Sequence, residues 1–130
     1  MRSQRGFTII EVLVVSAIFG ILALIAVPQY SAYRERAYTM ATMSDVSRIA
    51  RAQQELFESS SSFKEISTCS EIGADSRCSI DGLPGINALS KGISMNVQTS
   101  HSGFVVTARH IKGIKTCSWD STKGGPVLCS

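Results

Sequence analysis

The chain has 130 residues, of which 44% are hydrophobic and only 18% are charged, and its formal net charge is +3. This composition excludes intrinsic disorder, which needs low hydrophobicity and high net charge, and the length indicates a single domain. The small excess of basic residues does not indicate a nucleic-acid-binding protein. Arg2 and Arg5 precede the first apolar run, and the remaining charges nearly balance.

The first long feature is an apolar run over residues 7–27 (FTIIEVLVVSAIFGILALIAV), in which Glu11 is the one charged residue. As a helix, this run would be about 31 Å long, which is close to the thickness of a bilayer core. An ordinary secretory signal peptide is disfavoured, because its apolar region has roughly 7 to 15 residues and carries no carboxylate.

Two other interpretations of this run remain. In a plain membrane anchor, the basic start would keep the N-terminus in the cytoplasm and export the rest. Glu11 would then lie in the membrane without a cationic partner, at a cost of about 2 to 3 kcal/mol. If the chain is instead cut between Gly6 and Phe7, the new amino group of Phe7 could pair with Glu11 of a neighbouring helix. Such pairing would remove the penalty of an unpaired buried charge.

Several residues around the apolar run form one pattern. A short basic leader ends in a glycine, and a phenylalanine and a glutamate follow at the first and fifth positions after it; the residues concerned are Gly6, Phe7, Glu11, Gly20 and Pro28. Over residues 1–34 the chain thereby resembles type IV pilins and the related pseudopilins. The resemblance implies that a membrane peptidase cuts after Gly6 and methylates the amino group of Phe7.

The same resemblance implies where the protein acts and with which partners. The precursor is expected in the inner membrane, and the processed chain in an extracellular pilus. The expected partners are the prepilin peptidase, the pilus assembly machinery and further copies of the chain, which would associate through the helix of residues 7–28. Glu11 and Pro28 are the residues expected to matter for assembly.

Residues 29–58 have the pattern of an amphipathic helix, and Pro28 before them predicts a kink or a locally melted turn. Apolar residues recur at intervals of three or four. The predicted buried stripe is Tyr33, Ala37, Met40, Met43, Val46, Ala50 and Phe57, widened by Ile49 and Leu56. Charged residues, Asp45 among them, are expected to face solvent. The serine run at 59–62 predicts the end of the helix.

The remainder predicts an α+β head over residues 29–130. Residues 59–91 show no sustained period and are interpreted as a loop with one short helical turn at most. Residues 92–130 contain short alternating segments separated by glycine-containing turns, which predict an antiparallel meander of four strands. One face of the amphipathic helix would cover this sheet, while the apolar half of the helix, residues 7–28, would protrude. A helix wrapped by a meander is also what the resembled family has.

Four cysteines in a short exported chain indicate disulfides. We favour Cys69 with Cys78, which would close a short loop, and Cys117 with Cys129, whose predicted strands flank a turn, although four cysteines allow three pairings. The spacings C-x8-C and C-x11-C exceed the short spacings of zinc sites, so no metal is expected. The resemblance implies that a C-terminal disulfide pins the end of the chain against the sheet.

No residue pattern predicts catalysis, and neither an enzyme activity nor a cofactor is expected. His101 and His110 are predicted at the surface, and Trp119 is expected to pack beside the Cys117–Cys129 disulfide. The basic residues near the predicted strand ends are expected to form a solvated rim, with DNA binding as the alternative; they are Arg109, Lys112, Lys115 and Lys123.

The function that the sequence favours is a structural subunit of a type IV pilus serving adhesion, twitching motility or DNA uptake. A minor pilin or a type II secretion pseudopilin would share residues 1–34. The major pseudopilins typically carry an acidic calcium site near the C-terminus, whereas residues 109–130 contain a single acid, Asp120. A membrane-anchored binding module that never polymerises is the alternative from another class, and it predicts no cut at Gly6.

Overall fold

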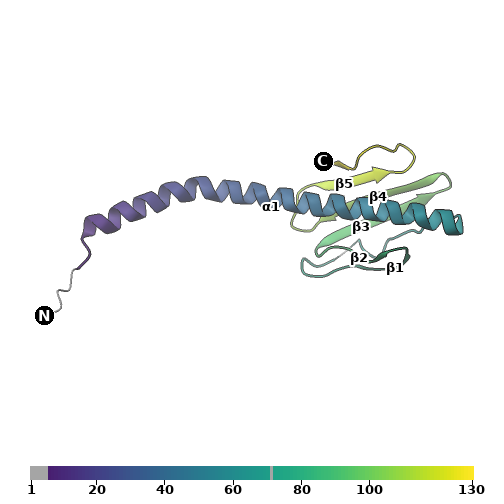
Figure 1. Cartoon of the computed structure of the whole chain (residues 1–130), viewed down its shortest axis with the longest axis horizontal. Helices are drawn as coiled ribbons and strands as arrows, with labels where there is room; N and C mark the ends of the chain where they lie inside the picture. Colours follow the sequence, from purple (N-terminus) through teal and green to yellow (C-terminus); the bar gives the residue numbers. More distant parts are fainter. Residues whose placement is uncertain (1–5, 71) are drawn as a thin grey trace. The chain divides into compact units, whose positions relative to one another are not determined.

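The computed structural model describes residues 6–70 and 72–130, so the predicted leader lies outside the described residues except for Gly6. The chain divides between Arg34 and Glu35 into an N-terminal unit and a head. The described elements are α1 (Ile9–Ser60), β1 (Ser79–Leu83), β2 (Ile86–Ala88), β3 (Ile93–Ser100), β4 (Gly103–His110), β5 (Thr116–Asp120) and β6 (Leu128–Cys129) (Figure 1).

Helix α1 is continuous over its 52 residues and contains Pro28. The locally melted turn that Pro28 suggested does not form there. A proline removes one backbone hydrogen bond, and in a long helix the bonds on either side hold the adjoining turns together. The helix ends within the predicted serine run: Ser61 has a positive φ of 53°, and its N–H donates to the carbonyl of Phe57 at 2.7 Å.

The buried face of α1 in the head differs from the predicted stripe. Its buried residues are Thr42, Asp45, Val46, Ile49, Ala50, Ala52 and Gln53. Met40 is 68% exposed and Phe57 is 45% exposed, and Tyr33, Ala37 and Met43 are exposed as well. The predicted stripe was wrong at these positions because it admitted only apolar residues, whereas Thr42, Asp45 and Gln53 find polar partners inside the head.

Two of these buried polar side chains tie α1 to the segments that follow it. The carboxylate of Asp45 accepts hydrogen bonds from the N–H of Ser90 at 2.7 Å and from the hydroxyl of Ser90 at 3.2 Å. It also pairs with Arg48 at 3.1 Å. Gln53 forms two bonds with the backbone of Lys64: Oε1 accepts at 2.8 Å and Nε2 donates at 2.5 Å. The prediction that Asp45 faces solvent was therefore wrong.

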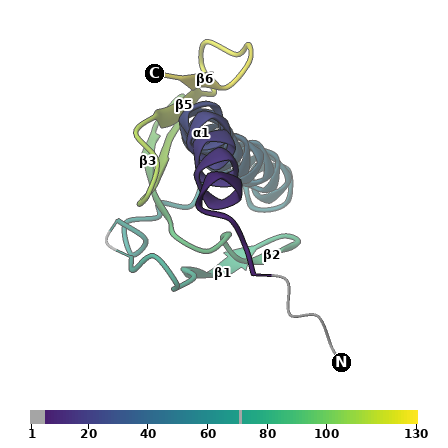
Figure 2. The same cartoon turned by 90° about the vertical axis from the view of Figure 1, so that its left-hand side faces the viewer.

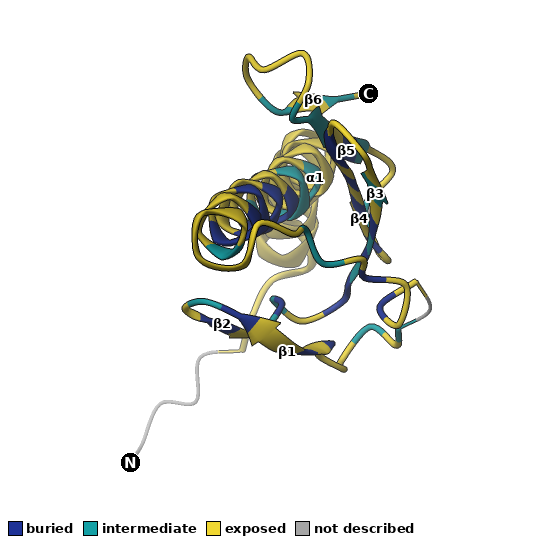
Figure 3. Cartoon of the chain, turned by 90° about the vertical axis from the view of Figure 1, so that its right-hand side faces the viewer, coloured by how far each residue is buried: buried dark blue, intermediate teal, exposed yellow. Residues whose placement is uncertain are grey.

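Strands β3 to β6 form the predicted four-stranded antiparallel meander in sequence order, so the α+β fold class is confirmed. β3 and β4 pair along their whole length, from Ile93 opposite His110 to Ser100 opposite Gly103. Alternate residues on these two strands are buried with α1 in one core (Figure 3): Ile93, Met95, Val97, Phe104, Val106 and Ala108. β5 begins at Thr116, three residues after the Lys112–Gly113 turn.

A hairpin of β1 and β2 occupies part of the segment that was interpreted as a loop. Leu83 lies opposite Ile86, so Pro84 and Gly85 form a two-residue turn. Gly85 has a φ of 69°, a conformation that favours glycine after proline in such a turn. The loop interpretation was wrong because the strand register shifts between Ser79 and Leu83, and this irregularity interrupts the alternation that identifies a strand.

The structure joins the cysteines in the two pairs that the sequence favours. Cys69 bonds to Cys78, with their Cα atoms 5.5 Å apart. Cys117 of β5 lies opposite Cys129 of β6, with the Cα atoms 4.0 Å apart. The adjacent residues Thr116 and Ser130 exchange backbone hydrogen bonds at 2.9 and 3.1 Å, so the cysteines occupy a position where antiparallel strands approach closely. The bond holds the short β6 at the edge of the sheet, near the C-terminus (Figure 2).

His110 is buried at 8% exposure, so its predicted surface position was wrong. Its ring stacks on that of Tyr38 with the centroids 4.1 Å apart, and its Nδ1 accepts a hydrogen bond from the N–H of Lys112 at 3.1 Å. Burial lowers the pKa of His110, and Lys112 lowers it further, while a hydrogen bond to the Lys91 backbone and the charge of Glu35 oppose the shift. His101 is exposed, as predicted.

Replacing Asp45 tests the tie between α1 and Ser90. Asp45→Ala leaves the half-buried N–H of Ser90 without an acceptor, so we expect the free energy of unfolding to fall by about 1 to 3 kcal/mol. The measurement is chemical denaturation of the detergent-solubilised full chain, followed by Trp119 fluorescence. Glu55→Ala, at an exposed position on the same helix, is the control and should change stability by less than about 0.5 kcal/mol. Equal effects of the two substitutions would contradict the tie.

The environment of His110 predicts a pH dependence. Its pKa is lowered in the folded head, so the unfolded chain binds the proton more readily. The contribution of neutral His110 to stability is complete above the unfolded pKa of about 6.5 and is lost as pH falls through the folded pKa. His110→Gln keeps an acceptor for Lys112 but does not titrate, so its unfolding free energy should depend less on pH between about 7 and 5. His101→Gln, the control, should retain the wild-type slope.

Candidate processing and assembly site

The predicted cleavage point lies in an exposed segment without regular secondary structure. Gly6, Phe7 and Thr8 precede α1, and the side chain of Phe7 is 85% exposed. A Cβ atom added to Gly6 would meet no atom within 4 Å. Exposed irregular backbone is the form of substrate that proteases reach most readily, so the geometry of the Gly6–Phe7 peptide bond suits processing.

Glu11 has a partner within its own chain that the sequence analysis missed. One carboxylate oxygen, Oε2, accepts hydrogen bonds from the N–H of Thr8 at 2.9 Å and from its hydroxyl at 2.8 Å. The N–H of Glu11 lies 3.4 Å from the same hydroxyl and donates to it. Thr8 immediately precedes the helix, so the two residues form a capping box. The T-x-x-E pattern was visible in the sequence, but only cations had been considered as partners for Glu11.

The N-terminal unit presents apolar side chains on all sides of the helix. From Ile9 to Val27, every large apolar side chain is at least 50% exposed. By length and composition, α1 is able to cross a membrane. A helix that is apolar all round needs lipid or other helices around it. Gly20 and Pro28 both lie within this helix, and no atom lies within 4 Å of a Cβ added to Gly20.

The basic residues of the head do not all have the same surroundings. Arg109, Lys112 and Lys115 are exposed at the end of β4 and in the turn that follows it. Lys123 lies in the loop between β5 and β6 and pairs with Asp120 at 3.5 Å. The pKa of Asp120 is lowered, first by the Thr122 hydroxyl and then by the Thr122 N–H, which donate to its carboxylate at 2.7 and 2.9 Å.

Trp119 is a packing residue of the same loop region. Its ring centroid lies 5.5 Å from that of Phe104 in the core, and its indole N–H donates to the carbonyl of Gly125 at 3.0 Å. This bond fixes the loop that the Cys117–Cys129 disulfide closes. Within residues 6–70 and 72–130, no three histidine, cysteine, aspartate or glutamate side chains gather as metal ligands.

Comparison with known proteins concerns the N-terminal part of the chain. Residues 1–27 match the prokaryotic N-terminal methylation motif. A fimbrial protein of Pseudomonas aeruginosa is 46% identical over 54 residues, which make up 42% of this chain and 35% of that protein. The type IV major fimbrial protein FimA of Dichelobacter nodosus is 47% identical over 49 residues, or 38% of this chain and 31% of that protein.

A type IV major alpha-pilin of Moraxella bovis is 51% identical over 39 residues, which cover 30% of this chain and 24% of the relative. The similarity thus spans about a third or less of the length of these relatives. No solved structure is significantly similar to the chain. The methylation motif and these relatives confirm the predicted resemblance: the N-terminal part of this chain is similar to that of type IV fimbrial and pilin proteins.

Proposed function

We propose that the chain is a structural subunit of a type IV pilus, made as an inner-membrane precursor and assembled outside the cell. A peptidase cuts between Gly6 and Phe7, the new amino group of Phe7 is methylated, and the N-terminal helices pack together in a filament. The observation that carries the proposal is the exposed apolar helix of residues 9–27, with Glu11 in its first turn. Packing such helices together removes apolar surface from water at about 25 cal/mol per Å².

The capping box leaves Glu11 able to pair with a neighbour. Both bonds from Thr8 fall on Oε2, so Oε1 can accept a hydrogen bond from the amino group of a neighbouring Phe7. Burying the carboxylate then requires that cation, because an unpaired buried charge is strongly unfavourable. The same carboxylate thus begins the helix within the subunit and selects the position of the next subunit.

Two alternatives are distinguishable. A minor pilin or a type II secretion pseudopilin would use the same N-terminal helix and differ in abundance and destination. The relatives named above include major fimbrial and pilin subunits, which favours the major type. A binding module on a plain anchor, including a DNA-binding one that uses the exposed cations, would stay uncut and would not polymerise.

Intact mass tests processing and export. We expect protein from a sheared surface fraction to lack residues 1–6, to carry about 14 Da for one methyl group, and to gain about 4 Da on reduction of the two disulfides. Membrane fractions should also contain the uncut precursor. An uncut chain confined to membranes would exclude the pilin function and favour the anchored module.

A matched set of substitutions separates the capping role of Glu11 from its charge. Glu11→Gln retains the capping box, since glutamine also serves at this position, but removes the charge. We expect Glu11→Gln to be processed normally and to form almost no filaments. Thr8→Ala removes the cap and keeps the carboxylate, so it should still assemble, with a helix weakened by about 1 kcal/mol.

Filament yield by electron microscopy and precursor processing by immunoblot are the two measurements for this set. The pattern of defects identifies the cause of any failure. If Thr8→Ala abolishes assembly and Glu11→Gln does not, the glutamate acts as a cap and the proposed pairing with Phe7 is wrong. If both variants assemble normally, neither role of Glu11 is needed for polymerisation.

A further inference from the structure

The turn between β4 and β5 carries the most exposed large apolar side chain among the described residues of the head. Ile114 is 83% exposed, and Ile111 in the same turn is 45% exposed. Neither belongs to the hydrophobic core. Exposed aliphatic side chains in pairs on a short turn need an explanation outside the fold, because burying them would release about 1.5 to 3 kcal/mol each.

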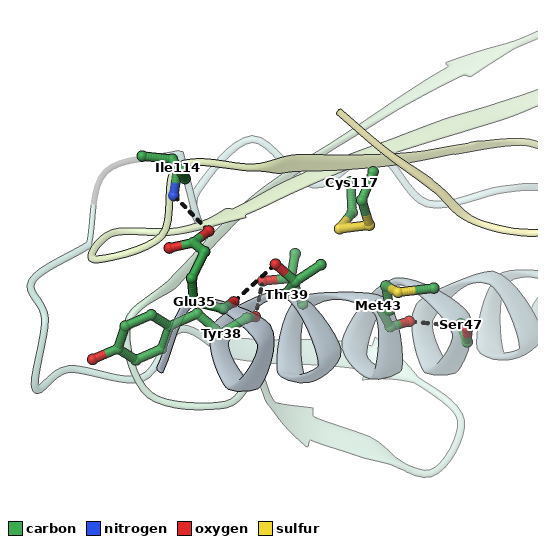
Figure 4. Close-up of a disulfide and its surroundings, with 9 residues drawn as sticks. Glu35, Tyr38, Thr39, Met43, Ser47, Ile114 and Cys117 are labelled. Atoms are coloured by element: carbon green, nitrogen blue, oxygen red, sulfur yellow. Dashed lines mark hydrogen bonds between the residues drawn. A yellow bond between two sulfur atoms is a disulfide. The ribbon is translucent and has the colours of Figure 1, made fainter. Parts of the chain in front are cut away.

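The backbone N–H groups from Ile111 to Ile114 are already hydrogen bonded within the head. The N–H of Ile111 donates to the Gly92 carbonyl at 2.7 Å, and that of Gly113 donates to the His110 carbonyl at 2.9 Å. Lys112 donates to His110 Nδ1, and Ile114 donates to Glu35 Oε1 at 3.0 Å (Figure 4). Four consecutive N–H groups are thus satisfied, so residues 111–114 can enter a poorly hydrated environment without leaving any of these four donors unpaired.

The charged residues within and next to the turn in the sequence are all basic. Residues 109–119 contain Arg109, Lys112 and Lys115 and no acidic residue. Glu35, which faces the turn from α1, accepts the N–H of Ile114. Apolar side chains flanked by cations are suited to the interface of an anionic membrane, where each cation near the surface contributes about 1 kcal/mol. Two copies of the turn facing each other would instead bring like charges together.

The turn is attached close to the membrane segment along the chain. Glu35, to which it is bonded, follows Val27, the last residue of the apolar run, by eight residues. Eight residues of chain span at most about 28 Å, so Glu35, to which the turn is bonded, can lie no farther than that from the end of the apolar run. Such tethering raises the effective concentration of the turn at the surface, so a weak contact is sufficient.

We propose that the β4–β5 turn, residues 111–115, is a membrane-docking site for anionic phospholipid. Ile111 and Ile114 enter the headgroup region, and Arg109, Lys112 and Lys115 contact lipid phosphates. The site acts in the membrane-anchored precursor and so rests on the proposed function. It seats the head on the membrane surface until the subunit is extracted for assembly.

Quenching of tryptophan fluorescence by brominated lipid tests the site. The full chain with Trp119→Phe is reconstituted into vesicles of phosphatidylcholine with or without brominated phosphatidylglycerol. A single tryptophan is then introduced at one of three positions. Ile114→Trp reports on the turn, and Phe19→Trp reports on the apolar run. Phe57→Trp is an exposed control on α1, 22 residues beyond Glu35. We expect quenching of Ile114→Trp and Phe19→Trp but not of Phe57→Trp. Circular dichroism checks that each variant is folded.

Adding Lys112→Gln and Lys115→Gln tests the role of charge. Each substitution should lower the ratio of docked to undocked heads about fivefold, seen as lost quenching of Ile114→Trp with that of Phe19→Trp unchanged. Because glutamine is introduced away from the reporter, the preference of tryptophan for interfaces cannot produce this loss.

Three outcomes would overturn the proposal. Quenching of Phe19→Trp without quenching of Ile114→Trp means that the anchor is inserted and the turn does not dock. A blue shift of Ile114→Trp that depends on protein density and not on brominated lipid means that the turn contacts another copy of the chain. Absence of quenching of Phe19→Trp means that the membrane anchor of the proposed function is itself missing.

Discussion

The whole structure depends on a single helix whose two parts must satisfy different surroundings. From Ile9 to Val27, α1 is apolar on all sides, so that it needs lipid or similar helices around it. Within the head, the same helix buries polar side chains as well as apolar ones, because Asp45 and Gln53 have partners there. A carboxylate or amide is tolerated in a core only when it is hydrogen bonded. The head therefore fixes the rotation of the helix through a few polar bonds, and the N-terminal part keeps its surface for other molecules.

The sequence predicts the regular parts of this design well and the polar parts poorly. Strands β3 and β4 bury alternate residues over most of their length, and glycine-containing turns mark their ends, so the meander follows from period and turn chemistry. Asp45 and His110 were assigned to the surface because residue type alone gives a low probability of burial for charged or titratable groups. Their partners, Ser90 and Tyr38, are distant in sequence. The local sequence around Asp45 and His110 therefore does not predict these contacts. The β1–β2 hairpin was missed for a different reason: its Pro84–Gly85 turn is recognisable in the sequence, but the irregular register of β1 interrupts the alternation of the strand.

The surroundings of Glu11 differ from those that the sequence argument considered. The sequence analysis singled it out because a carboxylate in an apolar run lacked a cation. The capping box with Thr8 supplies two donors to that carboxylate, so the charge is partly stabilised before any neighbour arrives. A carboxylate at the third position of a helix is also favoured by the helix dipole. These terms lower the cost of removing the Glu11 carboxylate from water, compared with a carboxylate that has no hydrogen-bond donors.

Side-chain hydrogen bonds and two disulfides hold the loops of the head in place around its small core. Gln53 binds the backbone at Lys64 and Asp45 binds it at Ser90, so the two ends of the segment between α1 and the sheet are fixed to the helix. The Cys69–Cys78 bond closes a loop inside that segment, and the Cys117–Cys129 bond closes the last hairpin. Loop closure stabilises mainly by limiting the unfolded chain. Because each closure is anchored separately to α1 or to the sheet, the intervening surface residues can change without disturbing the helix on which the rest of the molecule is built.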